Sequence, residues 1–132
     1  MAISICLDIF AVDNNNQDAL VIYILALTDQ LSQSESKVHR NKITDSIKKL
    51  NSEFLRHYYS GIFLERQARS LLKHSMSRSF AYDGFIEAIA EFEIAEKMAP
   101  DHCADPILRY NSCLRTIKKE NLQPRQEFDE LY

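Results

Sequence analysis

The chain has 132 residues, of which 45% are hydrophobic and 27% are charged, and its formal net charge is −3. This composition is typical of a folded globular domain and excludes an intrinsically disordered chain. The small negative charge gives no reason to expect nucleic acid or an acidic membrane as the partner. Only 2 Gly and 3 Pro are present, which favours long helices with short connections over an all-β fold.

Three features of the sequence bear on where the protein works. The cysteines, Cys6, Cys103 and Cys113, are an odd number without CxxC spacing, which favours reduced thiols. The N-terminus lacks the basic region and the cleavage site of a signal peptide. The longest apolar run, residues 19–27, is shorter than the ~18 residues that span a bilayer. We therefore expect a cytoplasmic protein that does not enter a membrane.

The first 31 residues are expected to form two helices joined by an Asn-rich turn. In the helix over residues 1–12, the apolar positions that recur at threes and fours are Ala2, Ile5, Cys6 and Ile9. The helix over residues 18–31 has its apolar face at Leu20, Ile24, Leu27 and Leu31. Because the first helix has little polar surface, its apolar strip predicts self-association through the N-terminal segment, most simply as a two-fold homodimer.

A β-hairpin is the alternative for the same segment. In residues 3–9, isoleucine and leucine alternate with other residues, which is the pattern of a half-buried strand. The later run VIYILAL is β-branched and aromatic enough for a second strand, with NNNQD as the turn. A two-stranded hairpin alone is marginal in water and no third strand is visible, so the helical interpretation is preferred.

Two further helices are expected over residues 34–50 and over a segment that includes residues 60–75. The first should direct inward Val38, Ile43, Ile47 and Leu50. The second has apolar residues at threes and fours, namely Phe54, Leu55, Tyr58, Ile62, Leu64, Ala68, Leu71 and Leu72. The polar residues 76–84, which end in Gly84, then predict an enlarged joint that is either a functional insertion or an ordinary surface loop.

The stretch EAIAEFEIAEKMAPD at residues 87–101 predicts a helix over residues 85–99. With about 3.6 residues per turn, one apolar stripe comprises Phe85, Ala88, Ile89, Phe92, Ala95 and Ala99. A second stripe comprises Ile86, Ala90 and Ile94, while Glu87 and Glu91 share a solvated side. Two apolar stripes predict neighbours on two sides, as in a bundle or a stacked helical repeat.

The final helix is expected over ADPILRYNSCLRTIKKE, residues 104–120. Asp105 is predicted as its N-cap, and Pro106 suits its first turn. Its apolar surface should consist of Ile107, Leu108, Tyr110, Leu114 and Ile117. Lys118 and Lys119 suit the negative end of the helix dipole. The single domain is thus expected to cover residues 1–120, with residues 121–132 as a C-terminal tail.

The spacing of Ala88, Phe92, Ala95 and Pro100 resembles the second helix of a tetratricopeptide repeat, a unit of about 34 residues. Ala68 suits the close-contact position of the preceding repeat helix, although the separation from Ala88 exceeds that of a standard repeat. The resemblance implies an all-α fold in which about five or six helices form antiparallel hairpins stacked in a tetratricopeptide-like array. A plain helical bundle is the alternative.

Two further segments resemble a group of uncharacterised bacterial tetratricopeptide-like proteins. The first has the pattern GxxxERxA, here Gly61, Glu65, Arg66 and Ala68. The second has the pattern ILRWN[ST]CxR, here Ile107, Leu108, Arg109, Tyr110, Asn111, Ser112, Cys113 and Arg115. Tyr110 stands where tryptophan is expected. The resemblance implies a fold and no known activity.

Cationic and polar side chains on two of the expected helices are the candidate partner-binding residues. They are Arg66, Arg69 and Lys73, at i, i+3 and i+7 on one face, together with Arg109, Asn111 and Arg115 on the last helix. Because arginine binds carboxylates bidentately, a groove lined by these residues predicts binding of an acidic peptide or a partner helix. The competing interpretation is that Glu65, Arg66 and Arg109 form ion pairs that only tie helices together.

No catalytic or metal site is expected. His102 and Cys103 are adjacent but have no partner pair at the spacing of a zinc site. Cys103 or Cys113 as a nucleophile would need an orienting group and an oxyanion site, and no motif indicates them. We therefore expect a protein-interaction module, a scaffold or adaptor without a cofactor. An enzyme, or an accessory subunit of an enzyme complex, is the alternative.

Overall fold

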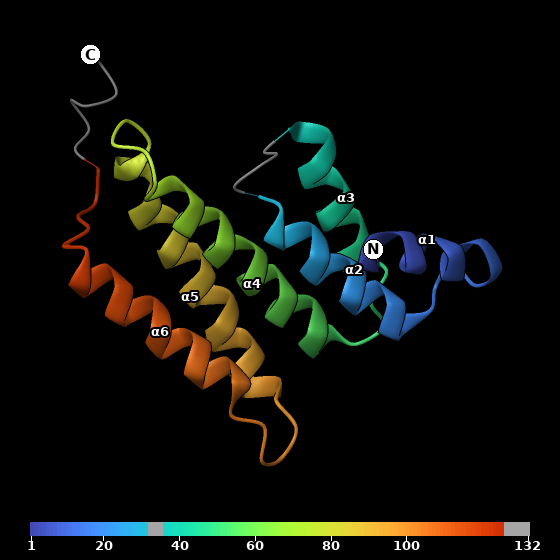
Figure 1. The fold of residues 1–132 in the computed structure, drawn as a ribbon. Coiled ribbons are helices and arrows are strands. Elements are labelled where there is room, and N and C mark those ends of the chain that lie inside the picture. The colour runs from blue at the N-terminus through green and yellow to red at the C-terminus, as the bar shows by residue number, and fades with distance from the viewer. Residues whose placement is uncertain (32–35, 126–132) are drawn as a thin grey trace.

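The computed structural model describes residues 1–31 and 36–125, and within these ranges the chain is all-helical (Figure 1). The helices are α1 (Ala2–Val12), α2 (Gln17–Asp29), α3 (Lys37–Lys48), α4 (Glu53–Leu71), α5 (Ala81–Met98) and α6 (Asp105–Lys119), with a 3₁₀ turn η1 (Arg78–Phe80) before α5. The all-α prediction is confirmed. None of these helices is both long enough and apolar enough to cross a membrane.

The β-hairpin alternative is wrong, because helices α1 and α2 occupy the two segments considered as strands. The side chain of Asn16 accepts a hydrogen bond from the Ala19 N–H at 2.9 Å and caps the start of α2. Such a cap satisfies one of the N–H groups that a helix leaves without a partner in its first turn. The Asn-rich turn therefore favours a new helix over a returning strand.

Two hydrophobic cores share helix α4. The first core lies among α1, α2, α3 and α4, and Leu20, Ile24 and Ile43 are fully buried in it. The second lies among α4, α5 and α6 and contains Phe85 and Phe92. Helices α4, α5 and α6 run antiparallel to their neighbours in sequence, and α1–α3 lie on the other side of α4 (Figure 1). Helix α6 consequently lies at the edge of the molecule.

Helix α5 begins earlier than the sequence predicts. It starts at Ala81, so much of the expected joint over residues 76–84 is helical. A Cβ atom added to Gly84 would lie 2.9 Å from the Ala68 Cβ atom. Gly84 therefore allows α5 to approach α4 closely. It belongs to a helix contact and not to the predicted joint.

The two apolar stripes of α5 have different surroundings. The first stripe is buried as predicted at Phe85, Ala88, Ile89, Phe92 and Ala95, whereas its last member, Ala99, follows the helix and is half-buried. The second stripe is exposed, at Ile86, Ala90 and Ile94, so the prediction of a neighbour on that side is wrong for the described residues. Glu91 is not simply solvated, because its carboxylate lies 2.7 Å from the His57 ring of α4.

In α3, the prediction that Val38 points inward is wrong. Ser36 caps the helix by accepting from the His39 N–H at 3.1 Å. With this start, Val38 lies on the solvent side of the first turn, whereas His39 is buried and its Nε2 lies 2.8 Å from the Leu27 carbonyl oxygen. A polar bond thus anchors the beginning of α3 to α2. The other inward positions, Ile43, Ile47 and Leu50, are buried as predicted.

The predicted apolar surface of α6 is largely wrong. Ile107, Leu108 and Leu114 are exposed, and the buried residues of the helix are Pro106 and Cys113. The reason is that α6 packs against the molecule on one side only (Figure 1). The predicted N-cap is also wrong, since Asp105 is the first helical residue and Ala104 precedes it.

The end of α6 is fixed by a left-handed residue. Asn121 has a φ of 51°, and the next N–H group, that of Leu122, donates to the Ile117 carbonyl at 3.0 Å. This is the hydrogen bond of a Schellman cap. It buries Leu122, in the expected tail, against the second core.

We expect Asn121→Ala to lower the free energy of unfolding by about 1 kcal/mol, because a left-handed conformation costs an alanine about 1–2 kcal/mol. Asn121→Gly is the matched control and should leave stability nearly unchanged, since glycine adopts this conformation readily. Urea unfolding of the three proteins measures both effects. Equal losses for Ala and Gly would mean that the Asn121 side chain, and not the backbone, stabilises the cap.

Helix α1 presents part of the predicted apolar strip. Cys6 is buried against α2, so its predicted exposure is wrong, whereas Ala2, Ile5 and Ile9 are exposed as expected. The self-association prediction therefore rests on the remaining exposed residues of α1, to which Val12 adds.

A two-fold dimer through α1 should appear as a doubled mass in sedimentation velocity at micromolar concentration. Ile5→Asp and Ile9→Asp place charges in the strip and should return the protein to a monomer. Val38→Asp, an exposed change on α3, is the control that should leave the dimer intact. A monomeric wild-type chain would contradict the prediction, and a dimer insensitive to both α1 substitutions would move the interface away from α1.

Candidate functional site

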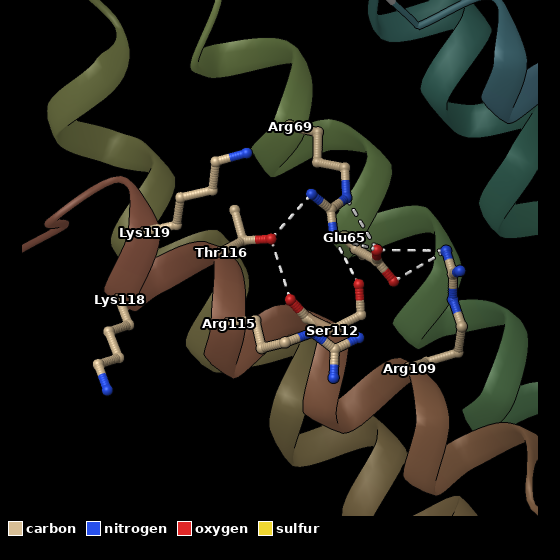
Figure 2. A pocket seen from close by; sticks show the side chains of 8 residues that line it. All are labelled: Glu65, Arg69, Arg109, Ser112, Arg115, Thr116, Lys118 and Lys119. Atoms are coloured by element: carbon tan, nitrogen blue, oxygen red, sulfur yellow. Dashed lines mark hydrogen bonds and ion pairs between the residues drawn. The ribbon is translucent and has the colours of Figure 1, made fainter.

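A buried carboxylate joins α4 to α6. Glu65 of α4 is fully buried, and its carboxylate contacts two guanidinium groups (Figure 2). The Arg69 Nη2 atom lies 2.8 Å from Oε2, and the Arg109 Nη2 atom of α6 lies 3.1 Å from Oε1. Burying an unpaired carboxylate is costly, so the two arginines permit Glu65 to occupy this position.

Arg69 is held by more than its ion pair. Its Nη1 donates to the Thr116 Oγ1 atom and its Nη2 to the Ser112 Oγ atom, each at 3.0 Å. The guanidinium also lies 5.4 Å from the centroid of the Phe85 ring. Both hydroxyl groups belong to α6 and lie one turn apart. Arg69 therefore links α4 to α6 through two hydrogen bonds. Its head group is therefore fixed before any ligand arrives.

These side chains line a hollow of about 860 Å³ between α4 and α6, here called the α4–α6 hollow. Its lining consists of Glu65, Arg69, Arg109, Ser112, Arg115, Thr116, Lys118 and Lys119. Five of these are cationic and one is a carboxylate, in a chain whose net charge is −3. Arg115 and Lys118 extend outward from the buried carboxylate (Figure 2). The hollow is therefore a local concentration of positive charge.

The structure places the six predicted binding residues on three different surfaces. Arg69, Arg109 and Arg115 line the α4–α6 hollow. Lys73 lies with Arg66 and Arg69 around a smaller hollow of about 230 Å³ toward α2. Asn111 faces the opposite side of α6, between α5 and α6. Only three of the six residues thus contribute to one site.

The sequence reasoning missed four members of the hollow. Ser112, Thr116, Lys118 and Lys119 all lie within a turn or two of Arg115 on α6. The signal was present, because residues three or four apart share a helix face. The two lysines also suit the helix dipole, and Ser112 also belongs to the resemblance, so neither pattern alone points to a hollow.

Arg66 ties α4 to α2. Its Nη1 lies 2.7 Å from the Asp29 Oδ1 atom, and it donates to the Thr28 Oγ1 atom at 2.6 Å and to the Leu25 carbonyl at 3.2 Å. For this residue the competing ion-pair interpretation fits the structure better than a binding role. The same interpretation applies in part to Glu65 and Arg109, whose pairing links α4 to α6.

We expect Arg66→Ala to lower the free energy of unfolding by about 1–2 kcal/mol, because a half-buried cation loses three hydrogen bonds while water partly replaces them. Lys73→Ala is the control, because Lys73 lies in the turn after the end of α4, and it should change stability by less than about 0.5 kcal/mol. Urea unfolding distinguishes them. If Arg66→Ala left stability unchanged but weakened the binding of an acidic ligand, Arg66 would have a binding role and not a structural one.

Of the two cysteines considered as a nucleophile, Cys113 is fully buried and Cys103 is half-buried. The pKa of the Cys113 thiol is raised to about 12, chiefly by burial and also by the nearby Glu65 carboxylate, while Arg69 and Arg109 act to lower it. Cys113 is therefore protonated at neutral pH, where a nucleophile needs the thiolate. Among residues 1–31 and 36–125, no three His, Cys, Asp or Glu side chains are grouped so that they could hold a metal ion.

The two segments that carry the bacterial resemblance contact each other or the core. Glu65 of the first segment pairs with Arg109 of the second. A Cβ atom added to Gly61 would lie 2.6 Å from the Phe92 ring, so this glycine lets α5 approach α4. In this chain, Gly61 thus serves a close helix contact, and Glu65 and Arg109 form an inter-helix ion pair.

No family model, curated protein or solved structure matches this chain. The tetratricopeptide-like likeness therefore rests on the residues quoted above. The function is inferred from the charge and geometry of the α4–α6 hollow.

Proposed function

We propose that this protein is an interaction module that holds an acidic segment of a partner protein in the α4–α6 hollow. The observation that carries the proposal is the set of five cationic side chains around a single buried carboxylate. Glu65 neutralises only part of this charge, so the surface stays positive although the whole chain is negative. Complementary charge selects an acidic partner and speeds its encounter.

The hollow has an inner and an outer set of cations with different tasks. Arg69 and Arg109 are the inner set, and Glu65 holds both in place, so binding costs little side-chain entropy. Arg115, Lys118 and Lys119 are the outer set, and in the described part of the chain no carboxylate pairs with them. The inner cations add positive potential to the hollow, because their guanidinium groups already donate to Glu65. The outer cations attract the partner, and the guanidinium group of Arg115 can bind one of its carboxylates bidentately.

A tetratricopeptide-like stacking of the helices belongs to the same proposal. The close approach of α4 and α5 at Gly84 and Ala68, and the antiparallel order of α4, α5 and α6, support it. In this arrangement the hollow lies where two helices of the same direction, α4 and α6, flank α5. An extended or helical segment of the partner fits along them as a ligand lies in a helical groove.

Fluorescence anisotropy tests the proposal with two labelled 12-residue peptides, one rich in Asp and Glu and one in which Lys replaces each acidic residue. The acidic peptide should bind and the basic one should not. Arg115→Glu and Lys119→Glu should each weaken binding at least about tenfold, because one attraction becomes a repulsion. Lys48→Glu, an exposed charge reversal on α3, is the matched control and should leave the affinity within about twofold.

Three results would contradict the proposal. Equal binding of both peptides would mean that charge does not select the ligand. An equal loss in Lys48→Glu would mean that only the overall charge matters. Tighter binding of a short RNA or of polyphosphate than of the acidic peptide would reassign the hollow to phosphate ligands. Because the contacts are partly exposed, the affinity should also fall as salt is raised.

A further inference from the structure

The outer sides of α5 and α6 form a second surface, which faces away from the α4–α6 hollow. It is defined by four exposed apolar residues, Ile86 and Ile94 of α5 and Ile107 and Leu114 of α6, and is here called the α5–α6 face. Their exposed fractions are 41%, 37%, 43% and 43%, so each keeps more than a third of its surface in water. A concentration of large apolar residues on the surface marks an interface.

A hollow of about 570 Å³ lies in the α5–α6 face. Its apolar lining residues are Phe92, Pro106, Ile107 and Tyr110, and its polar lining residues are Glu93, Glu96, Lys97 and Asn111. Ile86 lies seven residues before Glu93, and Leu114 lies seven after Ile107. Positions seven apart share a helix face, so Ile86 and Leu114 continue the two walls of this hollow, which Ile107 itself lines. Ile94 follows Glu93 on the exposed side of α5.

The shape of the α5–α6 face fits a helix. Two adjacent antiparallel helices present parallel apolar stripes with a groove between them, and another helix packs into such a groove through residues at i, i+3, i+4 and i+7. The stripe at Ile86, Ala90 and Ile94 has this helical spacing and is exposed. A partner helix of about 15 residues, which spans about 22 Å, would cover the face.

The charge of α5 decides what kind of helix fits. Asp83, Glu87, Glu93 and Glu96 are acidic, and no ion pair holds any of them in the described part of the chain. Lys97 is the one basic residue of α5 and lines the hollow beside Glu93 and Glu96, so the four carboxylates leave this helix acidic. A partner with Lys or Arg beside its apolar stripe would neutralise these carboxylates, whereas α1 of a second copy would bring Asp8 and Asp13 close to them.

We propose that the α5–α6 face docks an amphipathic helix of another protein that carries basic residues along its apolar stripe. This proposal goes beyond the binding of an acidic segment in the α4–α6 hollow. It concerns the opposite side of α6 and a partner of basic charge. The two surfaces would let one chain join two partners. Their tests use different variants and different peptides, so either proposal can fail while the other holds.

A phage-displayed library tests it. The library presents 15-residue helical peptides with a fixed leucine stripe, in which the flanking positions are free to be Lys, Glu or Ser. Selection on the wild-type protein should enrich Lys at the flanks. Selection on a Glu93→Lys, Glu96→Lys double variant should shift the enrichment toward Glu, because the partner charge follows the charge of α5.

Synthetic peptides from the selection then report on the apolar contacts by anisotropy. Ile94→Lys and Ile107→Lys should each weaken binding at least about tenfold, and the milder Ile94→Ala and Ile107→Ala should act in the same direction. Val38→Lys, an exposed change on α3, should have no effect. Thermal unfolding of every variant checks that the fold is retained.

The proposal is overturned if the selection enriches no peptide, if Lys and Glu are enriched equally, or if Val38→Lys weakens binding as much as Ile94→Lys. It is also overturned if the wild-type chain sediments as a dimer that Ile94→Lys dissociates. That result would assign the α5–α6 face to a second copy of this chain.

Discussion

Replacing Phe92 by alanine should lower the free energy of unfolding by about 3–5 kcal/mol, the range found when a core phenylalanine is truncated. Phe92 is fully buried at the centre of the second core, and its ring lies 5.9 Å from the Tyr58 ring, centroid to centroid. Gly61 of α4 lies directly against it, so the α4 backbone supports one side of the cavity and cannot readily collapse. Urea unfolding followed by circular dichroism measures the loss.

Ile86→Ala is the matched control for this prediction, because Ile86 lies on the same helix and is exposed. It should change the free energy of unfolding by less than about 1 kcal/mol. If Phe92→Ala cost no more than this control, α5 would have to pack on α4 through a different face. A large loss for both variants would instead show that the outer stripe of α5 is covered in solution.

Where apolar spacing is regular and a helix is packed against the core, the sequence predicts the buried face. The stripe from Phe85 to Ala95 is the best example, because five of its residues are buried as expected. The same reasoning fails for α6, which has apolar residues on more than one side. Spacing alone does not tell which side faces the molecule, and the edge position of α6 leaves Ile107 and Leu114 in water.

The centre of the candidate site was harder to predict. A glutamate in the middle of a helix normally faces water, and nothing near Glu65 in the sequence shows that it is buried. Its partner Arg109 lies 44 residues away. Only the packing of α6 beside α4 brings the two together. Arg69 and Arg109, two of the predicted binding residues, both contact Glu65. The sequence groups them by their chemistry and gives no distance between them.

Gly61 of α4 lies in close contact with the Phe92 ring of α5. A Cβ atom at Gly61 would lie 2.6 to 2.9 Å from three atoms of the Phe92 ring, much closer than van der Waals contact allows. Glycine in the interior of a helix costs about 1 kcal/mol relative to alanine. The close contact with Phe92 therefore offsets the low helix propensity of Gly61. Any larger residue at position 61 must displace the Phe92 ring or move α4 and α5 apart.

We accordingly expect Gly61→Leu to lower the free energy of unfolding by about 3 kcal/mol, the upper part of the range for overpacked cores, despite leucine's better helix propensity. The same change in a Phe92→Ala background should cost much less, because the leucine side chain fills the space that the ring leaves. The double variant should therefore be more stable, by at least about 1.5 kcal/mol, than the sum of the single losses predicts. Gly61→Leu combined with Ile86→Ala is the control cycle and should be additive, since Ile86 lies on the exposed side of α5. Additive losses in the Gly61 and Phe92 cycle would show that the two residues do not touch, and the packing of α4 on α5 described above would then be wrong.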